Sequence, residues 1–429
     1  MTITIVGHGY VGLVTACVFA DFGNTVYVIG HTKEKVDRLK KGDPIIYEPG
    51  LKELLQKNLD GKRIIFTMEY EEAVGASDIV FITVGTPPKE TGEADLTAVI
   101  DVARKIGANL KKKFTVVSCK STVPVGTNIK IETIINRHKS KSVDFAVASV
   151  PEFLREGTAL SDTYGPDRVV IGSDSKKAIQ LLLELHEPIE SKKIVTNLAS
   201  AELIKYTSNC MLATKISFAN LIALYCQELG ADVEMVLESV GLDRRIGRNF
   251  LYPGIGYGGS CLPKDVKAFI SIGRNHKIDA GFFQEVEKVN ATIRNSFTDR
   301  IRKMSPGKKV AILGLSFKPN TDDIREAPSI YLIEDLLKSG FEIKAYDPVA
   351  ADNVKKILDG RIKFSRDPYQ AMDGADALII STEWNEFKKI DLDKIKKLLK
   401  NPVIFDGRNI YNPVVMKKQG FKYYSIGRS

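Results

Sequence analysis

The sequence predicts an α/β protein with two doubly wound parallel-sheet domains joined by a helical middle domain. The opening segment ITIVGHGYVG, from Ile3, has the pattern of a buried strand that ends in a glycine turn. KKVAILGLSF, from Lys308, repeats that pattern, and GASDIVFIT and GADALIIST occupy similar places in the two halves. Residues 198–229 lie between the halves, contain no Gly or Pro, and carry apolar side chains at helical spacing. An internal duplication around a helical middle is the simplest account of these observations.

The first sheet domain is expected over residues 1–196, where strand and helix patterns alternate. A helical run over 13–22 follows the glycine turn and a second strand covers 25–29, so the chain opens with a β-α-β unit. The further elements expected in this domain are strands over 78–84, 115–118 and 145–150 and a helix over 96–110.

The helical middle domain is expected over residues 197–300 and the second sheet domain over 301–429. The run 198–229 is long enough for one central helix, which at about 1.5 Å per residue would form the spine between domains and the seam of a dimer. A glycine-rich stretch, 252–260, interrupts the helical pattern, and SPG at 305–307 forms the linker to the second sheet domain.

Composition and charge exclude several classes of protein. The 44% hydrophobic and 27% charged fractions are those of a folded globular chain, not of a disordered or collagen-like one. We expect a cytoplasmic protein that is neither exported nor membrane-spanning, because there is no leader pattern and no long uninterrupted apolar run. The 5 cysteines include no C-x-x-C pair, which argues against a disulfide framework and a zinc site. The net charge of +9 suits an anionic partner, but the scattered lysines argue against nucleic acid.

The glycine turn of the first domain has the spacing of a dinucleotide fingerprint. Gly7, Gly9 and Gly12 form G-x-G-x-x-G directly after a strand and before a helix. The first glycine allows the tight turn, the second lets the backbone approach a pyrophosphate, and the third lets the helix pack on the strand. This domain is therefore predicted to be Rossmann-like, and the second domain repeats the fold without the full fingerprint.

The residue after the second strand bears on the choice of cofactor. Gly30 stands where an acidic residue usually holds the adenosine ribose, and His31, Thr32, Lys33 and Lys35 follow it. A carboxylate there would repel a 2′-phosphate, whereas glycine leaves room and the neighbouring side chains can donate to it. We hypothesise that NADP is tolerated or preferred, and NAD held through other contacts is an equally good interpretation. Asp347 ends the equivalent strand of the second half, where any ligand would be held differently.

The motif GYGGSCLPKD, residues 256–265, is the most specific local signal. Cys261 precedes Pro263, a residue suited to the first turn of a helix expected over 264–270. A thiol at a helix N-terminus beside Lys264 should have a pKa below ~8.5, which makes it a nucleophile. A buried structural cysteine is the alternative for this motif alone. The other four cysteines, flanked by apolar residues, are expected in the core.

Two further groups of polar residues could act on a ligand. Lys205 and Asn209 are four apart on the long helix, where a cation and an amide could hold an oxyanion or a water. PEFLREG, residues 151–157, would place Glu152 and Glu156 on one side of a short helix after a strand end, where a carboxylate can be a general base. Salt-bridged surface residues are the alternative for Lys205 and Asn209.

The chain resembles the UDP-glucose/GDP-mannose dehydrogenase family along almost its whole length. The resemblance rests on nine strings in the same order: VGHGYVG, TVGTPP (83–88), KSTVPVGT (120–127), PEFLREG, ELIKYTSN (202–209), RIG (245–247), GYGGSCLPKD, GLSFKPNTDDIRE (314–326) and FDGRN (405–409). RIG followed by GYGGSC is more similar to the UDP-glucose branch. A GDP-mannose or UDP-N-acetylhexosamine relative, or a non-catalytic nucleotide-sugar-binding relative, is the alternative.

The resemblance implies a four-electron oxidation of the C6 alcohol of a nucleotide sugar to a carboxylate, with two NAD(P) reduced and no metal. After the first hydride transfer, Cys261 would add to the aldehyde as a thiohemiacetal, the second transfer would give a thioester, and water would release the acid. Lys205 and Asn209 would steady the oxyanion. The remaining catalytic residues would be Asp265 and Glu156 for proton transfer and water activation, and Thr122 and Glu152 for orienting a water.

The resemblance also implies the binding residues. Those for the dinucleotide would be Gly7, His8, Gly9, Tyr10, Val11, Gly12, Gly30, His31, Thr32, Lys35, Thr83, Gly85, Thr86, Pro87, Ser121, Thr122, Glu156, Lys264 and Arg325. Those for the nucleotide sugar would be Glu152, Phe153, Leu154, Arg155, Lys205, Asn209, Arg245, Tyr252, Gly254, Gly256, Tyr257, Gly258, Phe317, Lys318 and Arg408. Arg245 would reach the sugar site of a neighbouring subunit, which implies a homodimer through the central helix.

Overall fold

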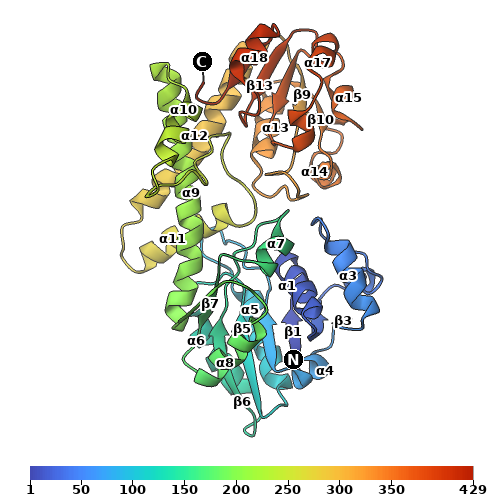
Figure 1. The fold of residues 1–429 in the computed structure, drawn as a ribbon, viewed down its shortest axis with the longest axis vertical. Helices are drawn as coiled ribbons and strands as arrows, with labels where there is room; N and C mark the ends of the chain where they lie inside the picture. The colour runs from blue at the N-terminus through green and yellow to red at the C-terminus, as the bar shows by residue number, and fades with distance from the viewer. Residues whose placement is uncertain (429) are drawn as a thin grey trace. The chain divides into compact units, whose positions relative to one another are not determined.

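The computed structural model describes residues 1–428, which form two compact units. The first unit is Met1–Ser208, and the second begins at Asn209. Helix α9 (Leu198–Leu229) belongs to both, because it starts in the first unit and continues into the second. Each unit contains one sheet with its own element order (Figure 1).

The first unit is a doubly wound sheet of eight strands in the order β3-β2-β1-β4-β5-β6-β7-β8. All neighbours are parallel except β6 and β7. The strands are β1 (Thr2–Val6), β2 (Thr25–Ile29), β3 (Ile64–Thr67), β4 (Ile79–Ile82), β5 (Phe114–Cys119), β6 (Asp144–Ser149), β7 (Arg168–Gly172) and β8 (Lys192–Thr196). The helices are α1 (Tyr10–Asp21), α2 (Lys33–Lys40), α3 (Leu51–Asp60), α4 (Tyr70–Ala76), α5 (Thr97–Asn109), α6 (Thr127–His138), α7 (Ala159–Tyr164) and α8 (Lys176–Leu185).

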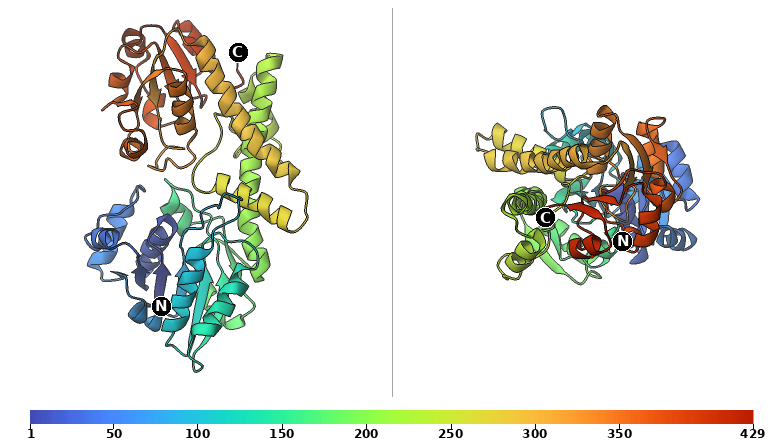
Figure 2. Two further views of the ribbon diagram at one scale, coloured as in Figure 1. Left: turned by 180° about the vertical axis from the view of Figure 1, so that it is seen from behind. Right: turned by 90° about the horizontal axis from the view of Figure 1, so that it is seen from above.

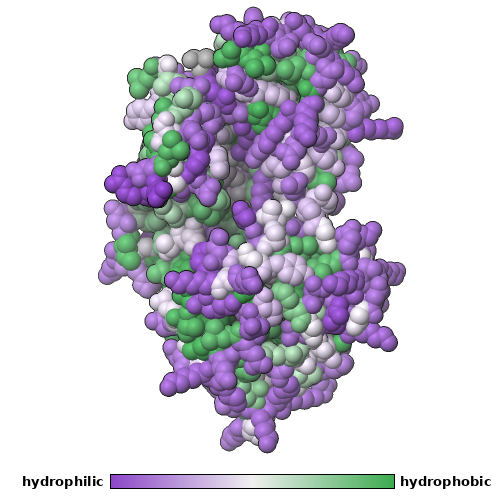
Figure 3. Space-filling model, viewed as in Figure 1, coloured by the Kyte–Doolittle hydropathy of each residue, from purple (hydrophilic) through white to green (hydrophobic). Residues whose placement is uncertain are grey.

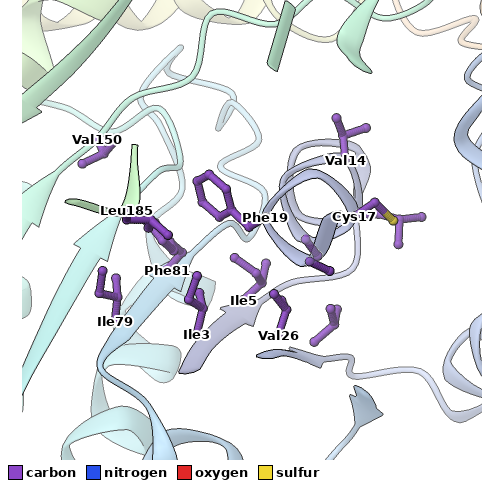
Figure 4. Packing of buried hydrophobic residues seen from close by; sticks show 14 of the residues in the cluster. Ile3, Ile5, Val14, Cys17, Phe19, Val26, Ile79, Phe81, Val150 and Leu185 are labelled. Carbon is purple, nitrogen blue, oxygen red and sulfur yellow. The ribbon is translucent and has the colours of Figure 1, made fainter. Parts of the chain in front are cut away.

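Apolar side chains pack on both faces of this sheet. On one face, Phe19 of α1 and Phe81 of β4 are buried with ring centroids 5.8 Å apart, beside Ile3 and Ile5 of β1 (Figure 4). The other face packs against α4, α5 and α6. Two buried faces explain why the central strands are continuous apolar runs. The carboxyl ends of β1, β4 and β5 then meet at one edge, where ligands of such sheets bind.

The second unit combines helices with a parallel sheet in the order β11-β10-β9-β12-β13-β14. Its sheet consists of β9 (Lys309–Leu313), β10 (Glu342–Tyr346), β11 (Lys363–Phe364), β12 (Ala377–Ile380), β13 (Val403–Asp406) and β14 (Lys422–Ser425). Its further helices are α10 (Val233–Gly241), α11 (Leu262–Asn275), α12 (Gly281–Met304), α13 (Pro328–Lys338), α14 (Ala351–Leu358), α15 (Pro368–Met372), α16 (Asn385–Lys388), α17 (Leu392–Leu398) and α18 (Pro413–Lys418). Residues of α9, α12 and the sheet share one apolar core, and Figure 2 shows α12 beside the sheet.

The long central helix is confirmed as one uninterrupted element of 32 residues. Among the described residues, α9 alone is long and apolar enough to cross a membrane by length and composition, a test that core helices of water-soluble proteins also pass. In this fold 44% of its most apolar window is buried.

The expected short helix at PEFLREG is wrong. Residues 151–158 form no helix, and α7 begins at Ala159. Glu152 accepts the backbone N–H of Leu154 at 2.8 Å, and Glu48, from a distant loop, accepts the N–H of Gly157 and of Ala159 at 2.6 and 2.7 Å. Side-chain acceptors therefore take the amides that a helix would have used.

Candidate functional site

The fingerprint turn of the first unit is packed so closely that it requires glycine. Gly7 has φ +121°, and a Cβ added at Gly12 would lie 2.0 Å from the carbonyl oxygen of Gly7. Thr83 closes the turn, because its hydroxyl donates to the carbonyl oxygens of Val6 and Gly7 at 3.0 and 3.1 Å. Gly9 precedes α1 and, within residues 1–428, no side chain caps that helix. The free N-terminal amides of α1 therefore fit the pyrophosphate of a dinucleotide.

Two further expected cofactor residues, Thr86 and Ser121, lie at the same edge of the sheet. Thr86, after β4, donates its hydroxyl to the carbonyl oxygen of Thr122 at 2.8 Å. Ser121, after β5, donates its hydroxyl to the carbonyl oxygen of Val84 at 2.6 Å. These bonds tie together the two loops that follow β4 and β5, beside the fingerprint turn.

The backbone at Gly30 is closely packed on the side where a side chain would stand. A Cβ at Gly30 would lie 2.4 Å from Cγ2 of Val36 and 3.4 Å from Nδ1 of His8. The His8 and His31 rings are 4.8 Å apart, edge to face. Burial, with His31 and Lys35 adding to it, lowers the pKa of His8 to about 4, so its ring is neutral at neutral pH. The exposed groups of 31–35 stay the predicted donors to any additional phosphate.

Lys205 and Glu152, predicted separately, form a buried ion pair in the first unit. The Lys205 ammonium lies 3.0 Å from Oε1 of Glu152, and both side chains are about 5% exposed. The ring of Phe153 lies beside this pair, with its centroid 5.3 Å from the Lys205 ammonium and 3.9 Å from the Arg168 guanidinium. Arg155, by contrast, points outward to Asp162, 2.6 Å away.

Two residues of the first unit were missed by sequence reasoning. Glu48 is buried and also accepts the Tyr10 hydroxyl, so it connects the start of α1 to the end of the 151–158 loop. Burial and this bond raise the pKa of Tyr10. Lys120 is buried directly after β5. A lysine at the carboxyl end of an apolar strand was the available signal for Lys120, whereas nothing in the local sequence distinguishes Glu48.

Cys261 is the exposed cysteine of the five, and it immediately precedes α11. Asp265, one turn further on, is fully buried, pairs with Lys264, and accepts a hydrogen bond from Nδ2 of Asn209 at 2.5 Å. The expectation that the other four cysteines lie in the core is confirmed. Burial raises the pKa of three of them, Cys17, Cys119 and Cys210, to about 12. The second unit thus offers one accessible thiol and, one helical turn along α11, a carboxylate that pairs with an amide and an ammonium.

Arg408 connects three loops of the second unit. Its guanidinium donates to the carbonyl oxygens of Ser381 at 2.9 Å and of Gly256 and Phe317 at 3.3 Å each. A Cβ at Gly258 would lie 2.1 Å from the carbonyl oxygen of Glu326, so the 256–259 loop also requires glycine. The structure therefore brings the expected substrate residues Gly256, Gly258, Phe317 and Arg408 together.

Other expected ligand-binding residues of the second unit are spread over its surface. Arg245 is 88% exposed and pairs with Asp243, and Tyr252 is 55% exposed. Arg325 pairs with Asp323 at 2.7 Å. Within residues 1–428 no group of three His, Cys, Asp or Glu side chains is arranged to hold a metal ion.

The strand-end carboxylate of the second unit binds its own glycine turn. Oδ2 of Asp347 accepts the backbone N–H of Leu315 at 2.7 Å and of Ser316 at 3.1 Å. The same oxygen accepts Nε1–H of Trp384 at 3.2 Å. In the first unit the equivalent turn amides are free for a pyrophosphate, whereas here a carboxylate already occupies them. This explains why the second unit keeps the fold without offering these amides to a pyrophosphate.

The fingerprint turn on a doubly wound sheet defines the first unit as a dinucleotide-binding domain. Comparison with known families agrees with this class. Residues 1–190 match the NAD binding domain of the UDP-glucose/GDP-mannose dehydrogenase family, residues 199–292 its central domain, and residues 311–413 its UDP binding domain.

Individual relatives match along the whole chain. UDP-glucose 6-dehydrogenase TuaD of Bacillus subtilis (strain 168) is 45% identical over 429 residues, covering 99% of this chain and 93% of TuaD. UDP-glucose 6-dehydrogenase of Rhizobium meliloti (strain 1021) is 44% identical over 438 residues, covering 100% of both chains. The structure of a UDP-glucose dehydrogenase from the hyperthermophilic archaeon Pyrobaculum islandicum matches with a TM-score of 0.93 and 38% identity, over 100% of this chain and 98% of that one. The chain belongs to the UDP-glucose/GDP-mannose dehydrogenase family.

Proposed function

We propose that this protein is an NAD-dependent UDP-glucose 6-dehydrogenase, which oxidises UDP-glucose to UDP-glucuronate and reduces two NAD. The observation that carries the proposal is the exposed Cys261 before α11, followed one turn later by the buried Asp265, which accepts a hydrogen bond from Asn209. It is supported by the 45% identity to TuaD over the full chain and by the match to the UDP binding domain.

Cys261 is the nucleophile of the proposed reaction. NAD, bound at the fingerprint turn, supplies the hydride acceptor for both oxidation steps. The Cys261 thiolate bonds to the aldehyde carbon from the first step, which gives a thiohemiacetal. Loss of a hydride and the hydroxyl proton from that adduct gives a thioester. Water then attacks the thioester carbon, the carbon–sulfur bond breaks, and the thiolate is released with the carboxylate.

The polar groups around these steps stabilise charge and hold protons. We infer that Lys205, fixed by Glu152, faces the oxyanion that develops at C6. Asn209, fixed by Asp265, donates to the same oxygen from one helical turn away on α9. Glu152 and Thr122 orient the hydrolytic water, and Glu156 takes its proton.

The test is near-UV absorbance of NADH during complete conversion of a known amount of UDP-glucose. About two NADH per sugar are expected from the four-electron stoichiometry, and GDP-mannose and UDP-N-acetylhexosamines should react slowly or not at all. Cys261→Ala should lose turnover and still bind UDP-glucose by calorimetry. Cys210→Ala, which changes a buried cysteine, is the matched control and should keep turnover. Undiminished NADH formation by Cys261→Ala would exclude the thioester route.

We infer that the chain acts in the cytoplasm as a homodimer through one face of α9. Met211, Phe218 and Tyr225 recur every seven residues and are 57%, 47% and 59% exposed, and Leu229 is 77% exposed. Figure 3 shows apolar residues at the surface where α9 and α10 lie. An exposed apolar stripe of this kind is typical of an interface. Tyr225→Glu should yield monomers in size-exclusion chromatography with light scattering, whereas a dimer that persists would place the interface elsewhere.

A further inference from the structure

A pocket of the first unit is lined in part by residues 150–154, and the proposed reaction does not use it. Its volume is about 50 Å³, which is room for more than one water. The lining includes Thr15 of α1, Lys120, Glu152, and His186 at the end of α8. The Thr15 hydroxyl is fully buried and has no hydrogen-bond partner within residues 1–428. The pocket is thus lined mostly by apolar side chains, with a few polar groups among them, and it touches the Lys205–Glu152 pair through Glu152.

Lys120 is the unexplained charge in this pocket. It is 8% exposed, and within residues 1–428 its ammonium makes no hydrogen bond or ion pair. A charge on so buried a side chain, without a hydrogen bond or ion pair to the protein, costs free energy, so a position that keeps one is a candidate for function. Replacing it with an apolar residue would have been the more stable solution.

The charged groups around Lys120 come from every neighbouring element. Glu152 and Lys205 are close enough to act on its charge, and they pair with each other at 3.0 Å. His186 lines the same pocket, and its Nδ1 contacts the carbonyl oxygen of Leu182 at 2.7 Å. Burial and Lys120 lower the pKa of His186 to about 4, so it carries no charge at neutral pH. The other two charged groups of the lining are engaged elsewhere, Asp162 with Arg155 and Arg168 with Phe153.

We propose that Lys120 is a positioning residue of the reaction, which acts through the Lys205–Glu152 pair. This inference rests on the proposed function. Lys205 and Glu152 cancel each other in charge, so Lys120 gives the group of three a net charge of one positive unit. A net positive group in a buried site favours the oxyanion that develops at C6 during each step. Lys120 thus supplies a positive charge in place of the charge of Lys205, which Glu152 neutralises.

The protonation of Lys120 sets the pH range of this effect. Burial lowers the pKa of Lys120 to about 8, with Glu152 opposing the shift and Lys205 adding to it. As the pH rises through this value the ammonium loses its proton and the group becomes neutral. Turnover of the wild type should therefore fall above pH 8 through the loss of this charge.

The experiment compares Lys120→Met and Lys120→Arg with the wild type, using UDP-glucose and NAD. Lys120→Met should lower kcat by roughly tenfold, less than the loss of a group that touches the oxyanion, and leave KM for UDP-glucose nearly unchanged. Its Tm should rise, because an unpartnered buried charge is removed. Lys120→Arg, which stays charged, should keep more of the rate and lose the decline above pH 8. Lys113→Met, at an exposed residue before β5, is the matched control and should have the kcat and the Tm of the wild type.

Each outcome decides the matter. A wild-type kcat in Lys120→Met overturns the proposal, as does a lower kcat with a lower Tm in both variants, since that pattern describes a structural lysine. If the wild type reduces no NAD with UDP-glucose, the proposed function fails first. The Tm of Lys120→Met is then still informative. A fall in Tm would show that Lys120 stabilises the fold, which overturns the proposal, and a rise would show that its charge is retained at a cost to stability.

Discussion

Replacing Asp347 with alanine should strongly destabilise the second unit. The Asp347 carboxylate accepts N–H groups from Leu315 and Ser316 of the glycine turn and from Trp384, and from Val349 and Ala350 of the following loop. The distances run from 2.7 to 3.2 Å, and the carboxylate is 3% exposed. Each buried donor left without an acceptor costs at least about 1 kcal/mol, so the four buried donors, those of Leu315, Ser316, Ala350 and Trp384, predict a loss of about 4 kcal/mol.

Urea unfolding followed by far-UV circular dichroism measures this loss, with the transition of the second unit fitted separately. Asp347→Asn keeps one acceptor oxygen and should lose roughly half as much stability. Asp359→Ala, which removes an exposed carboxylate of the same unit, is the matched control and should unfold like the wild type. A loss below about 1 kcal/mol in Asp347→Ala would refute the reasoning, because it would mean that water satisfies these donors without cost.

Three further predictions concern the first unit. Gly12→Ala should abolish NAD binding in calorimetry and cost about 2 kcal/mol of stability, since its Cβ would lie 2.0 Å from the Gly7 carbonyl oxygen; unchanged NAD affinity would contradict the tight turn. Lys35→Glu should lower kcat/KM with NADP by roughly tenfold and leave NAD turnover unchanged, and equal effects on both cofactors would remove the 31–35 segment from phosphate recognition. The pKa of Lys120 is lowered from 10.5 to about 8, so above pH 8 the unfolded chain binds more protons than the folded one. The free energy of unfolding of the wild type should therefore rise by up to about 3 kcal/mol relative to that of Lys120→Met by pH 10.5. If the urea midpoints of the two proteins change in parallel with pH, this lysine titrates normally.

Local patterns predicted the parts of the fold and site that short stretches of chain determine. The fingerprint turn at Gly7–Gly12 and the uninterrupted helix α9 follow from neighbouring residues, and both are present. Cys261 was recognisable because its exposure and its place before a helix depend on the motif around it.

The features that the sequence did not predict depend on contacts between distant segments. The pairing of Lys205 with Glu152 joins residues 53 positions apart, so spacing could not predict it. The helix expected over 151–157 is absent, and Glu48, about a hundred residues earlier, accepts the N–H of Gly157 at its end. In each case a tertiary contact overrode a correct local rule.

The bond between Trp384 and Asp347 gives the protein an internal optical probe. The chain contains one tryptophan, and it is buried in the second unit with its indole N–H on a carboxylate. Its emission should therefore shift to longer wavelength when this unit opens and stay unchanged when only the first unit does. Fluorescence would then follow one half of the molecule in the intact, unlabelled chain, namely the half that contains the match to a UDP binding domain.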